Sequence, residues 1–545
     1  MTDPLVSVLL PCRPDEADAL AHTLPFLRRQ SYSAWQLLVA GSEPVIAVAR
    51  SLAVDLPLPL RAVGVGEDAT RAEALARAVS ASDGSWLVVL DPGDELGEDA
   101  LSRIGDVVHQ DPSVDVIYSD EDEQDDDGTG PFRKPEWSPE YLEGLNYFGR
   151  LTAYRRAVVD AAGGVRPALE GAHEWDLALR VTELTDRIVH VPRPLCRRRR
   201  TLRLDWRDEP VRSAGRRAVL DRYARRGASG QVDMLAVPGC LLARPDLLHR
   251  PSVTVVIPTA GVRRLVGGRD VVIVRNCLDA LAERTDYRDF DVVLVVGEAE
   301  PPGLRRHAQE RLGSDRVSVV AVPGRFEFSR ACNTAAVLAT GEYLLLLNDD
   351  TEPMEPQWLD MLLERGQDPQ VGAVAPKLLF EDGTVQHSGV FRNPAGVPNH
   401  IHFHEVDGGG YHGSLQVTLN HTAVTGACLL IRRSTYLDVG GLTPRLPMSF
   451  GDVDLCLKLR ARGLRNVVVN AARLLHFESS SRDPTVTESE YAVLARRWPG
   501  DSALERYMSH RRLPLDLQTP KPTAAGDPAG ALSRSTVCAE PGFDS

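Results

Sequence analysis

The chain has 545 residues, of which 43% are hydrophobic and 25% are charged, and 62 Lys and Arg against 76 Asp and Glu give a net charge of −14. These values exclude a wholly disordered chain, and the longest apolar runs, such as Tyr343–Leu347, are far shorter than the ~20 residues of a membrane-spanning helix. The acidic balance argues against a general nucleic-acid binder, and the length predicts about two to four domains.

The cysteines and the first residues indicate the compartment. The eight cysteines include no CxxC pair, and their low density argues against a disulfide scaffold. The N-terminal stretch has no basic segment and runs directly into a strand-like sequence, so we interpret it as part of the fold and not as a signal peptide. We therefore expect a cytoplasmic protein.

In the first part of the chain, apolar strand-like runs alternate with segments of helical periodicity. Val6–Pro11 is a predicted buried strand, and Gly84–Glu95 is a second one that ends in acidic residues. Ala19–Arg29 and Thr70–Val79 have apolar residues spaced as on one face of a helix. This alternation predicts βαβ units around a mostly parallel sheet, and we place a first α/β domain at residues 1–200.

A connector is predicted at residues 201–250. It overlaps an arginine-rich stretch, Arg193–Arg226. A solvated helix is the favoured interpretation of such a charge run. The alternative is peripheral contact with anionic lipid headgroups at the inner face of the plasma membrane.

The second part of the chain repeats the alternation of strands and helices. Val253–Pro258 and Gly341–Glu352 are predicted strands, and we place a second α/β domain at residues 251–512. Residues 513–545 are rich in Pro, Gly, Ala and Ser and are predicted to form a disordered tail. The predicted helices of the second domain include Val274–Glu283, Arg330–Ala339 and Trp358–Glu364.

The two domains are related by an internal duplication. Three segments of the first domain match three segments of the second, and the order is the same in both. Three matches in order are hard to explain by chance, so the sequence predicts two tandem α/β domains with mixed, mostly parallel sheets. The matches are Val6–Pro11 with Val253–Pro258, Gly84–Glu95 with Gly341–Glu352, and Glu174–Arg180 with Asp452–Lys458.

Acidic residues follow the predicted strand Tyr343–Leu347. Asn348, Asp349 and Asp350 stand at its carboxyl end, which is where α/β sheets bind ligands. Mg²⁺ and Mn²⁺ prefer oxygen ligands and accept a substrate phosphate as one of them, so a metal site is one interpretation. The alternative is a turn, in which Asn and Asp are common.

Further candidates occur near the end of the second domain. Asp452 and Asp454 begin a segment whose apolar residues fit a strand or a helix face. A carboxylate there is either a general base for a hydroxyl nucleophile or a helix cap. His476 follows the apolar stretch Asn466–Leu475 and is either a metal ligand or an ordinary polar histidine.

Taken together, six segments of the second half carry a resemblance: VTVVIPT, FEFSRACNTAA, GEYLLLLNDDTE, AVTGACLLIRRS, SFGDVDLCLKLRARG and LLHFESSSR. They resemble a family 2 glycosyltransferase of the GT-A fold. The first half, with YSDEDE, FRKPEWSPEYL and EGAHEWDLALR, is similar to a companion domain often fused to such enzymes. The resemblance implies transfer of a sugar from a nucleotide-sugar donor to an acceptor hydroxyl, with inversion and with Mn²⁺ or Mg²⁺.

The resemblance also implies roles for single residues. Asp350 and Asp349 match the last and middle positions of the metal-binding DxD motif, and His476 matches a late histidine that joins the metal. Asp452 matches the catalytic base, although Gly451 stands where Glu is usual. The implied donor-binding residues are Pro258, Thr259, Glu298, Arg330, Asn333, Asn348 and Asp349, and Gly426 and Asp454 are implied on the acceptor side.

Two departures accompany these matches. Asn348 replaces the first Asp of the metal motif. Gly297 or Glu298 stands where the family commonly has an Asp that contacts the nucleotide base, so the identity of the donor stays open.

The duplication serves as an internal control. By sequence alignment the first domain lacks the last carboxylate of the metal motif and the late histidine, but keeps an acid at the position of the base. We therefore predict that the first domain is degenerate and that the second performs the transfer. The aligned residues are Asp91, Pro92 and Gly93 for Asn348–Asp350, Glu174 for Asp452, and Arg197 for His476 after a one-residue shift.

The sequence thus predicts an inverting, metal-dependent glycosyltransferase of cell-surface polysaccharide or glycolipid synthesis, acting on a glycan or lipid-linked glycan. The alternative is a non-catalytic glycan-binding or scaffolding protein built from decayed transferase domains. Two weaker patterns remain. Alternating His400, His402 and His404 favour a polar acceptor-site loop over a second metal site, and Asp120–Asp127 is predicted to be an exposed acidic loop.

Overall fold

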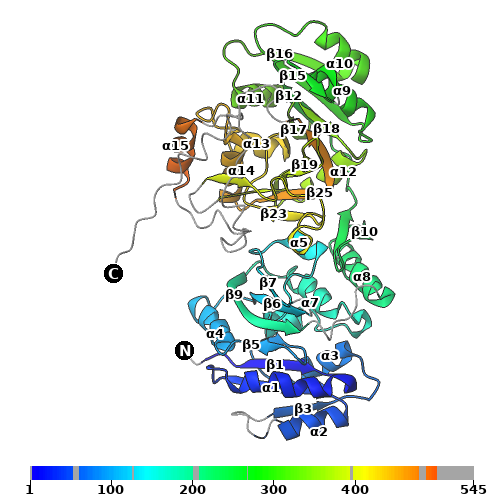
Figure 1. The fold of residues 1–545 in the computed structure, drawn as a ribbon, viewed down its shortest axis with the longest axis vertical. Helices are drawn as coiled ribbons and strands as arrows, with labels where there is room; N and C mark the ends of the chain where they lie inside the picture. The colour runs from blue at the N-terminus through cyan, green and yellow to red at the C-terminus, as the bar shows by residue number, and fades with distance from the viewer. Residues whose placement is uncertain are drawn as a thin grey trace. The chain divides into compact units, whose positions relative to one another are not determined.

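The computed structural model describes residues 3–52, 54, 60–125, 128–199, 208–266, 268–392, 397–477 and 487–499. They form two compact units that divide between Asp246 and Leu247 (Figure 1). Each unit is built around one large mixed sheet with helices packed on it, which confirms the predicted α/β class. The predicted tail at 513–545 lies outside the described residues.

The first unit contains a nine-stranded sheet with the order β3-β2-β1-β4-β8-β6-β9-β5, and β7 pairs with β6 at its side. The pairs of β1 with β2 and β4, and of β6 with β9, are parallel. A two-stranded sheet of β10 and β11 follows. The strands are β1 (Val6–Pro11), β2 (Trp35–Gly41), β3 (Leu60–Gly64), β4 (Trp86–Val89), β5 (Glu95–Leu96), β6 (Val116–Asp125), β7 (Gly128–Phe132), β8 (Ala153–Arg155), β9 (Ile188–Arg199), β10 (Gly230–Met234) and β11 (Leu241–Pro245).

The helices of the first unit cover the sheet and its edge. For example, α2 and α3 pack against β1, β2 and β3. The Thr70 hydroxyl accepts from the Glu73 N–H at the start of α3, while Glu73 bonds back to the Thr70 N–H, a capping box that fixes where this helix begins. The helices are α1 (Leu20–Arg28), α2 (Glu43–Leu52), α3 (Arg71–Ala81), α4 (Ala100–Gln110), α5 (Pro139–Gly144), α6 (Arg156–Ala161), α7 (His173–Val181) and α8 (Glu209–Arg225).

The second unit contains a ten-stranded sheet with the order β16-β15-β12-β17-β24-β19-β25-β18, to which β20 and β23 are added. Two short hairpins, β13 with β14 and β21 with β22, lie outside it. The strands are β12 (Val253–Pro258), β13 (Arg263–Val266), β14 (Arg269–Val272), β15 (Phe290–Val296), β16 (Val317–Ala321), β17 (Tyr343–Leu347), β18 (Thr351–Pro353), β19 (Val371–Leu379), β20 (Val385–His387), β21 (Val390–Arg392), β22 (Pro398–His400), β23 (Leu419–His421), β24 (Cys428–Arg432) and β25 (Arg465–His476).

The helices of the second unit lie between and beside these strands (Figure 1). Among the described residues, none of the helices of either unit is both long and apolar enough to cross a membrane. The helices are α9 (Ile273–Glu283), α10 (Leu304–Leu312), α11 (Phe328–Leu338), α12 (Trp358–Gly366), α13 (Arg433–Asp438), α14 (Gly451–Ala461) and α15 (Glu488–Arg497).

The two large sheets have the same topology. Each strand of the order β3-β2-β1-β4-β8-β6-β9-β5 has its counterpart at the same place in the second sheet. The sense of pairing agrees as well: β4 with β8 and β17 with β24 are antiparallel, whereas β6 with β9 and β19 with β25 are parallel. The internal repeat in the sequence is therefore a repeat of the fold.

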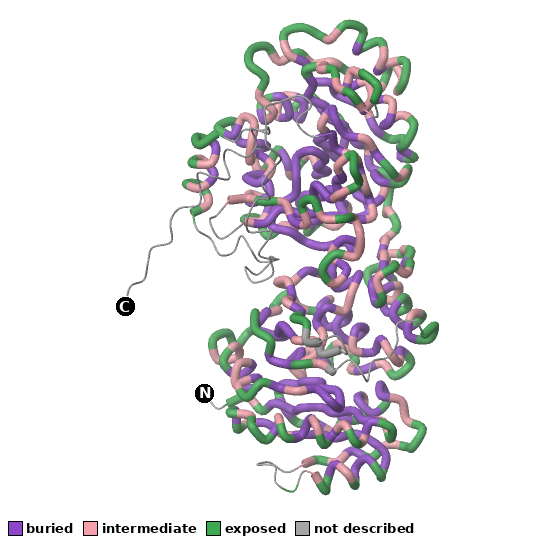
Figure 2. The backbone as a smooth tube through the Cα atoms, in the orientation of Figure 1, coloured by how far each residue is buried: buried purple, intermediate pink, exposed green. Residues whose placement is uncertain are grey.

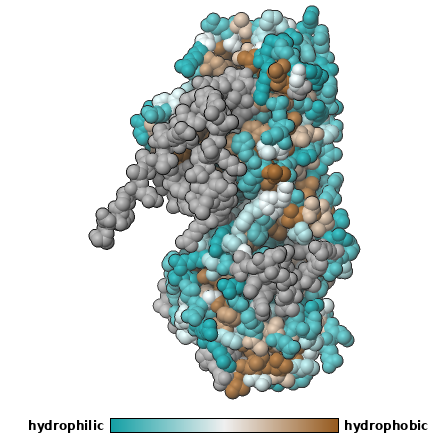
Figure 3. Space-filling view, in the orientation of Figure 1, coloured by the Kyte–Doolittle hydropathy of each residue, from teal (hydrophilic) through white to brown (hydrophobic). Residues whose placement is uncertain are grey.

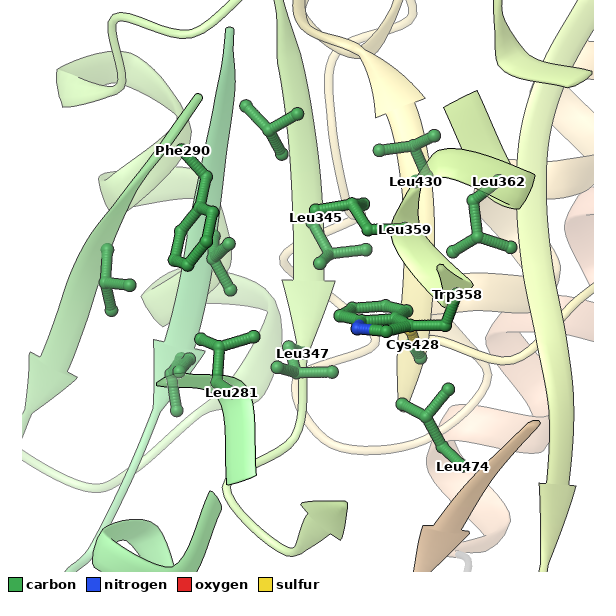
Figure 4. Packing of buried hydrophobic residues seen from close by; sticks show 14 of the residues in the cluster. Leu281, Phe290, Leu345, Leu347, Trp358, Leu359, Leu362, Cys428, Leu430 and Leu474 are labelled. Atoms are coloured by element: carbon green, nitrogen blue, oxygen red, sulfur yellow. The ribbon is translucent and has the colours of Figure 1, made fainter. Parts of the chain in front are cut away.

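Each unit has its own hydrophobic core, seen as the buried inner strands of Figure 2. Every residue of β1 and of β12 is buried, as expected for continuous apolar strands covered on both faces. In the second unit, Trp358 of α12 packs among leucines of β17, β24 and β25 (Figure 4). The side visible in Figure 3 is mostly hydrophilic, with smaller hydrophobic areas between.

Two sequence-based predictions differ from the structure. Much of the predicted connector packs on the first unit, because α8 lies against α7 and Arg222 bonds Glu143 at 3.1 Å. The predicted exposed acidic loop is instead largely strand β6. Asp120 and Glu121 are buried there, and each has a basic partner, His190 at 2.9 Å and Lys134 at 3.2 Å. In the sequence these acids look like an exposed acidic run, because their basic partners lie further along the chain.

Candidate active site

Asp349 and Asp350, two of the predicted metal-binding residues, lie in the loop that joins β17 to β18. A hydrogen bond to the residue before β24 holds this loop in place: the Asn348 N–H donates to the Ala427 carbonyl at 2.8 Å. Asp349 and Asp350 are both buried. Burial, and then the charge of Asp350, raises the pKa of Asp349 to about 7. A loop that concentrates carboxylates in this way is suited to a cation.

Asp349 is oriented by the end of β12. The Thr259 hydroxyl donates to Asp349 Oδ2 at 2.6 Å, and the Thr259 N–H donates to the Val295 carbonyl at 2.8 Å. Pro258 and Thr259, two of the predicted donor-binding residues, therefore lie beside the predicted metal loop.

His476 is the last residue of β25 and faces the same loop. Its Nε2 lies 3.1 Å from Asp350 Oδ1 and 3.2 Å from Asn348 Nδ2. Its Nδ1 lies 2.5 Å from Gln386 Oε1, which accepts hydrogen bonds only. This network assigns the proton to Nδ1, so that the Nε2 lone pair is available beside Asp350. An imidazole lone pair next to a carboxylate oxygen is a partial ligand set for a metal ion.

That ligand set fits Mn²⁺ or Mg²⁺ only with further ligands. No group of three His, Cys, Asp or Glu side chains that could hold a metal ion occurs within the described ranges. Such cations commonly take one or two protein carboxylates and complete their shell with water and substrate phosphates. Asp349, Asp350 and His476 match that partial role.

Asp452, the predicted base, lies in the first turn of α14 and is half-buried. The Gly426 N–H donates to Asp452 Oδ2 at 2.7 Å. Because the next residue, Ala427, accepts from Asn348, two consecutive residues connect Asp452 to the metal loop. Phe450, which precedes α14, has a φ of 61°, a conformation that bulky side chains rarely adopt and that is concentrated at functional sites.

Two predicted site residues have structural partners instead. Both polar ends of Asn333 are used: Nδ2 donates to the Leu442 carbonyl, and Oδ1 accepts from the Leu442 N–H and the Tyr436 hydroxyl. Asp454 is fully buried. Its carboxylate binds Thr443 at 2.6 Å and Trp498 and Arg497 at 2.9 Å. These atoms hold the fold together, and the predicted contacts of Asn333 with the donor and of Asp454 with the acceptor stay predictions.

The other predicted residues divide into two kinds. Glu298, just after β15, and Arg330 on α11 are exposed, which leaves their predicted donor contacts as predictions. Gly426, predicted on the acceptor side, holds Asp452 through its backbone. A Cβ at position 426 would approach the Asp452 Cβ to 3.3 Å, so the missing side chain allows this close approach.

Sequence reasoning missed Gln386. Gln386 lies in the short strand β20, whose sequence gives no signal of a partner at the end of β25. His402 and His404 lie in a turn after β22 and both have positive φ, so they belong to a loop, as predicted, and do not line a strand with His400. His400 instead faces His387 at 2.9 Å between their Nδ1 atoms.

Comparisons with known proteins show what the chain is similar to. The family described as glycosyltransferase like family 2 matches residues 250–498. The chain is 33% identical over 527 residues to the uncharacterized protein y4gI of Sinorhizobium fredii, covering 91% of this chain and 56% of that protein. It is 31% identical over 529 residues to the O-antigen biosynthesis protein RfbC of Myxococcus xanthus, covering 94% of this chain and 40% of that protein.

A shorter match is with an N-acetylglucosaminyl-diphospho-decaprenol L-rhamnosyltransferase of Mycobacterium tuberculosis, 30% identical over 186 residues, 29% of this chain and 57% of that protein. Among solved structures, a mannosyltransferase of Pyrobaculum calidifontis in complex with GDP-Man and Mn²⁺ covers 47% of this chain and 63% of its own, with 20% identity and a TM-score of 0.31. The chain spans about half the length of the first curated relatives. The similarity to glycosyltransferase family 2 thus covers residues 250–498, most of the second unit.

Proposed function

We propose that the second domain transfers a sugar from a nucleotide-sugar donor to an acceptor hydroxyl, with inversion at the anomeric carbon. One observation carries the proposal. Gly426 and Ala427 connect the carboxylate of Asp452 to the loop of Asp349 and Asp350. Asp452, which would be the general base, therefore lies close to the loop that would hold the metal, as direct displacement of a sugar from a diphosphate needs, and this proximity supports the proposal.

Asp349, Asp350 and His476 would hold Mn²⁺ or Mg²⁺ together with the donor diphosphate. When bound, the cation offsets the negative charge that develops on the departing diphosphate. Gln386 keeps the His476 ring in the tautomer that presents Nε2, and Thr259 keeps Asp349 turned toward the loop.

Asp452 would take the proton of the acceptor hydroxyl on a carboxylate oxygen. The hydroxyl oxygen then forms a bond to the anomeric carbon while the bond from that carbon to the diphosphate breaks on the opposite face. Because the Gly426 N–H fixes Oδ2, the carboxylate is oriented before the acceptor arrives. Attack from the face opposite the leaving group inverts the configuration of the sugar.

For the setting, we propose cell-surface polysaccharide or glycolipid synthesis with a glycan or lipid-linked glycan acceptor, in the cytoplasm or peripherally at the inner membrane face. Support comes from the names of two relatives, one in O-antigen biosynthesis and one acting on a diphospho-decaprenol compound. The arginines of α8 add little support for lipid contact. Arg222 and Arg225 are paired with Glu143 and Glu183.

A donor screen with Mn²⁺ tests the proposal. The purified chain is incubated with UDP-, GDP- and dTDP-linked sugars, and nucleotide release is measured with and without acceptor glycans. We expect turnover with at least one donor and a loss of ~10²–10⁴-fold in Asp452→Asn, because the general base is removed. Asp350→Asn should weaken Mn²⁺-dependent nucleotide binding. Asp438→Asn, exposed on α13, is the matched control and should behave as the parent chain.

Two outcomes would contradict the proposal. If no donor is turned over and UDP, GDP and dTDP with Mn²⁺ give no thermal stabilisation, the alternative of a non-catalytic glycan-binding or scaffolding protein is favoured. If Asp452→Asn keeps its turnover while Glu174→Gln loses it, the reaction belongs to the first domain.

A further inference from the structure

The loop that follows β22, residues 401–412, exposes large apolar side chains. Phe403, Val406 and Tyr411 are all exposed there. Among the described residues other than glycine, five have a positive φ, and three of these lie in this loop: His402, His404 and His412. Such a backbone is costly for a residue with a side chain, and it is concentrated at functional sites. The 401–412 loop is therefore a candidate binding surface.

Hydrogen bonds hold the 401–412 loop in place. The His402 ring lies 2.8 Å from Glu405 Oε2 through Nδ1 and 2.9 Å from the Ser414 hydroxyl through Nε2. The Ser414 carbonyl in turn accepts from Asn470 Nδ2 of β25 at 2.8 Å. The loop is thus fixed to the large sheet. A surface that is ordered in advance loses less conformational entropy when a ligand binds.

The same loop is hydrogen-bonded to the strand that supports the candidate metal site. The Val385 N–H donates to the Glu405 carbonyl at 2.8 Å, and the His404 N–H donates to the Val385 carbonyl at 2.7 Å. The residue after Val385 is Gln386, whose side chain holds His476. The loop therefore borders the residues that orient a proposed metal ligand.

A row of rings leads from the neighbourhood of Asp452 to the loop. The buried His387 ring accepts from the Thr425 N–H at 3.5 Å, and Thr425 precedes the glycine that holds Asp452. From there five rings follow one another, with centroids between 4.3 and 6.1 Å apart: His387, His400, Phe403, His404 and Phe380. The side chains of Phe403 and His404 are exposed. The row thus connects the proposed base to an aromatic surface.

The charges around these exposed rings are mostly negative. Glu381 and Asp382 are exposed in the turn before β20, and Glu405 belongs to the loop itself. The guanidinium of Arg264 lies 3.1 Å from Glu381 and offsets only that charge. An anionic ligand or an anionic membrane surface would be repelled by such a rim. The ligand that fits is therefore neutral.

A neutral saccharide matches this combination of rings and carboxylates. One face of a sugar ring carries C–H groups, which pack on the apolar face of an aromatic ring. The hydroxyl groups at its edge donate hydrogen bonds, and the carboxylates of Asp382 and Glu405 accept them. A lipid chain would use the apolar surface and leave the carboxylates without a role.

We propose that the exposed rings of Phe403 and His404 bind a sugar unit of the acceptor, next to the unit whose hydroxyl reacts at Asp452. The proposal rests on the proposed function, because it takes the acceptor to be a glycan. It gives the 401–412 loop a role in acceptor length: an acceptor of two or more sugar units contacts both Asp452 and the loop, and a single unit does not.

Saturation-transfer NMR on the full chain, in EDTA and without donor, tests the surface. The probes are the methyl glycosides of glucose, galactose, mannose, rhamnose and N-acetylglucosamine. We expect transfer to the C–H protons of at least one glycoside. Its affinity should be kept in Phe403→Trp and be about tenfold weaker in Phe403→Leu, because leucine keeps the apolar bulk without the ring face. Phe326→Leu is the matched control, since Phe326 is 38% exposed and Phe403 is 37% exposed.

Three outcomes would overturn the proposal. They are absence of transfer to every glycoside, equal transfer in Phe403→Leu and the parent chain, and equal losses in Phe403→Leu and Phe326→Leu. Sedimentation with phosphatidylglycerol vesicles tests a lipid surface instead. We expect no binding, and binding that Phe403→Leu retains would also overturn the proposal. Because the NMR measurement needs neither metal nor donor, failure of turnover in the second domain leaves it intact.

Kinetics give a second test with any donor that the chain turns over. Phe403→Leu should raise the KM for a disaccharide acceptor about tenfold and change kcat little, because the ring contacts a part of the acceptor that does not react. A fall in kcat with an unchanged KM would assign Phe403 to the reacting centre and overturn the proposal.

Discussion

At the scale of single residues, the candidate site depends on neighbours that hold the proposed ligands in place. Gln386→Leu removes the acceptor for the His476 Nδ1–H and frees the ring to turn or change tautomer. Loss of such an outer partner costs about 10–100-fold in metal affinity. We expect that loss in a titration of Mn²⁺ in the presence of UDP. Gln231→Leu, exposed on β10, should bind as the parent chain does, and equal affinities in both variants would contradict the assignment.

Sequence motifs indicated the charged candidate residues of the site. They did not indicate which polar side chains are already hydrogen-bonded within the fold. Asp350, Asp452 and His476 became candidates because each follows or begins a recognisable apolar segment, and their roles stay predictions. The partner of Asn333, Leu442, is more than 100 residues away, and no local pattern shows such a bond. Burial and partners of a polar side chain are properties of the folded chain.

Arg150 of the first domain gives a second prediction at this scale. Arg150→Ala leaves Asp91 and Glu174 without the cation that spans them, and because Arg150 and Glu174 are only half-buried the loss should lie near the low end of the ~3–5 kcal/mol of a broken buried pair. We expect that loss in chemical denaturation of the first unit. Arg150→Lys keeps the charge but cannot bond both carboxylates in a fork. The stability of this variant should therefore lie between that of the parent chain and that of Arg150→Ala. An Arg150→Ala chain as stable as the parent would show that the network is not coupled.

At the scale of elements, the sequence predicted the central strands well and their partners poorly. β12 and β17 are continuous apolar runs, which mark a buried strand locally. In contrast, β5 and β18 are only two and three residues long, and their edge places depend on β9 and β25. The duplication gave information that local patterns do not contain. Because the same segments occur in the same order in both halves of the sequence, the two halves were expected to share one fold.

The attachment of α15 to α14 gives a prediction for an element. Asp454 on α14 binds Arg497 and the Trp498 indole, which follow each other at the end of α15, and the α15 residue Glu490 accepts from the N–H groups of Met448 and Ser449. Asp454→Asn replaces a carboxylate oxygen by an amide NH₂ group, which cannot accept the hydrogen bonds that these side chains donate. We expect a loss of roughly 3 kcal/mol, the low end for a broken buried pair because Arg497 is partly exposed.

Denaturation of the second unit measures the Asp454→Asn loss, with Asp438→Asn as the exposed control. α15 also holds the loop before Phe450, so the variant should lower turnover as well. If Asp454→Asn kept full stability and lost only acceptor binding, the acceptor role predicted from the sequence would be supported.

At the scale of the whole molecule, two units with separate cores should unfold separately. One core gathers residues of β1, β2 and β4, and the other gathers residues of β12, β15 and β17, with no residue in common. Each unit exceeds the size at which a domain carries its own core. Calorimetry of the full chain should therefore show two transitions.

Each ligand and each variant should then change the unfolding temperature of one unit only. Mn²⁺ with the nucleotide of the accepted donor should stabilise only the second unit, by ~2.7 kcal/mol at about 100 times the dissociation constant, because binding to the folded state alone shifts unfolding by mass action. Arg150→Ala should lower only the transition of the first unit, and Asp454→Asn only that of the second. If one variant moved both transitions equally, the units would fold as one cooperative body. If Mn²⁺ and nucleotide moved the transition that Arg150→Ala lowers, the donor site would lie in the first domain.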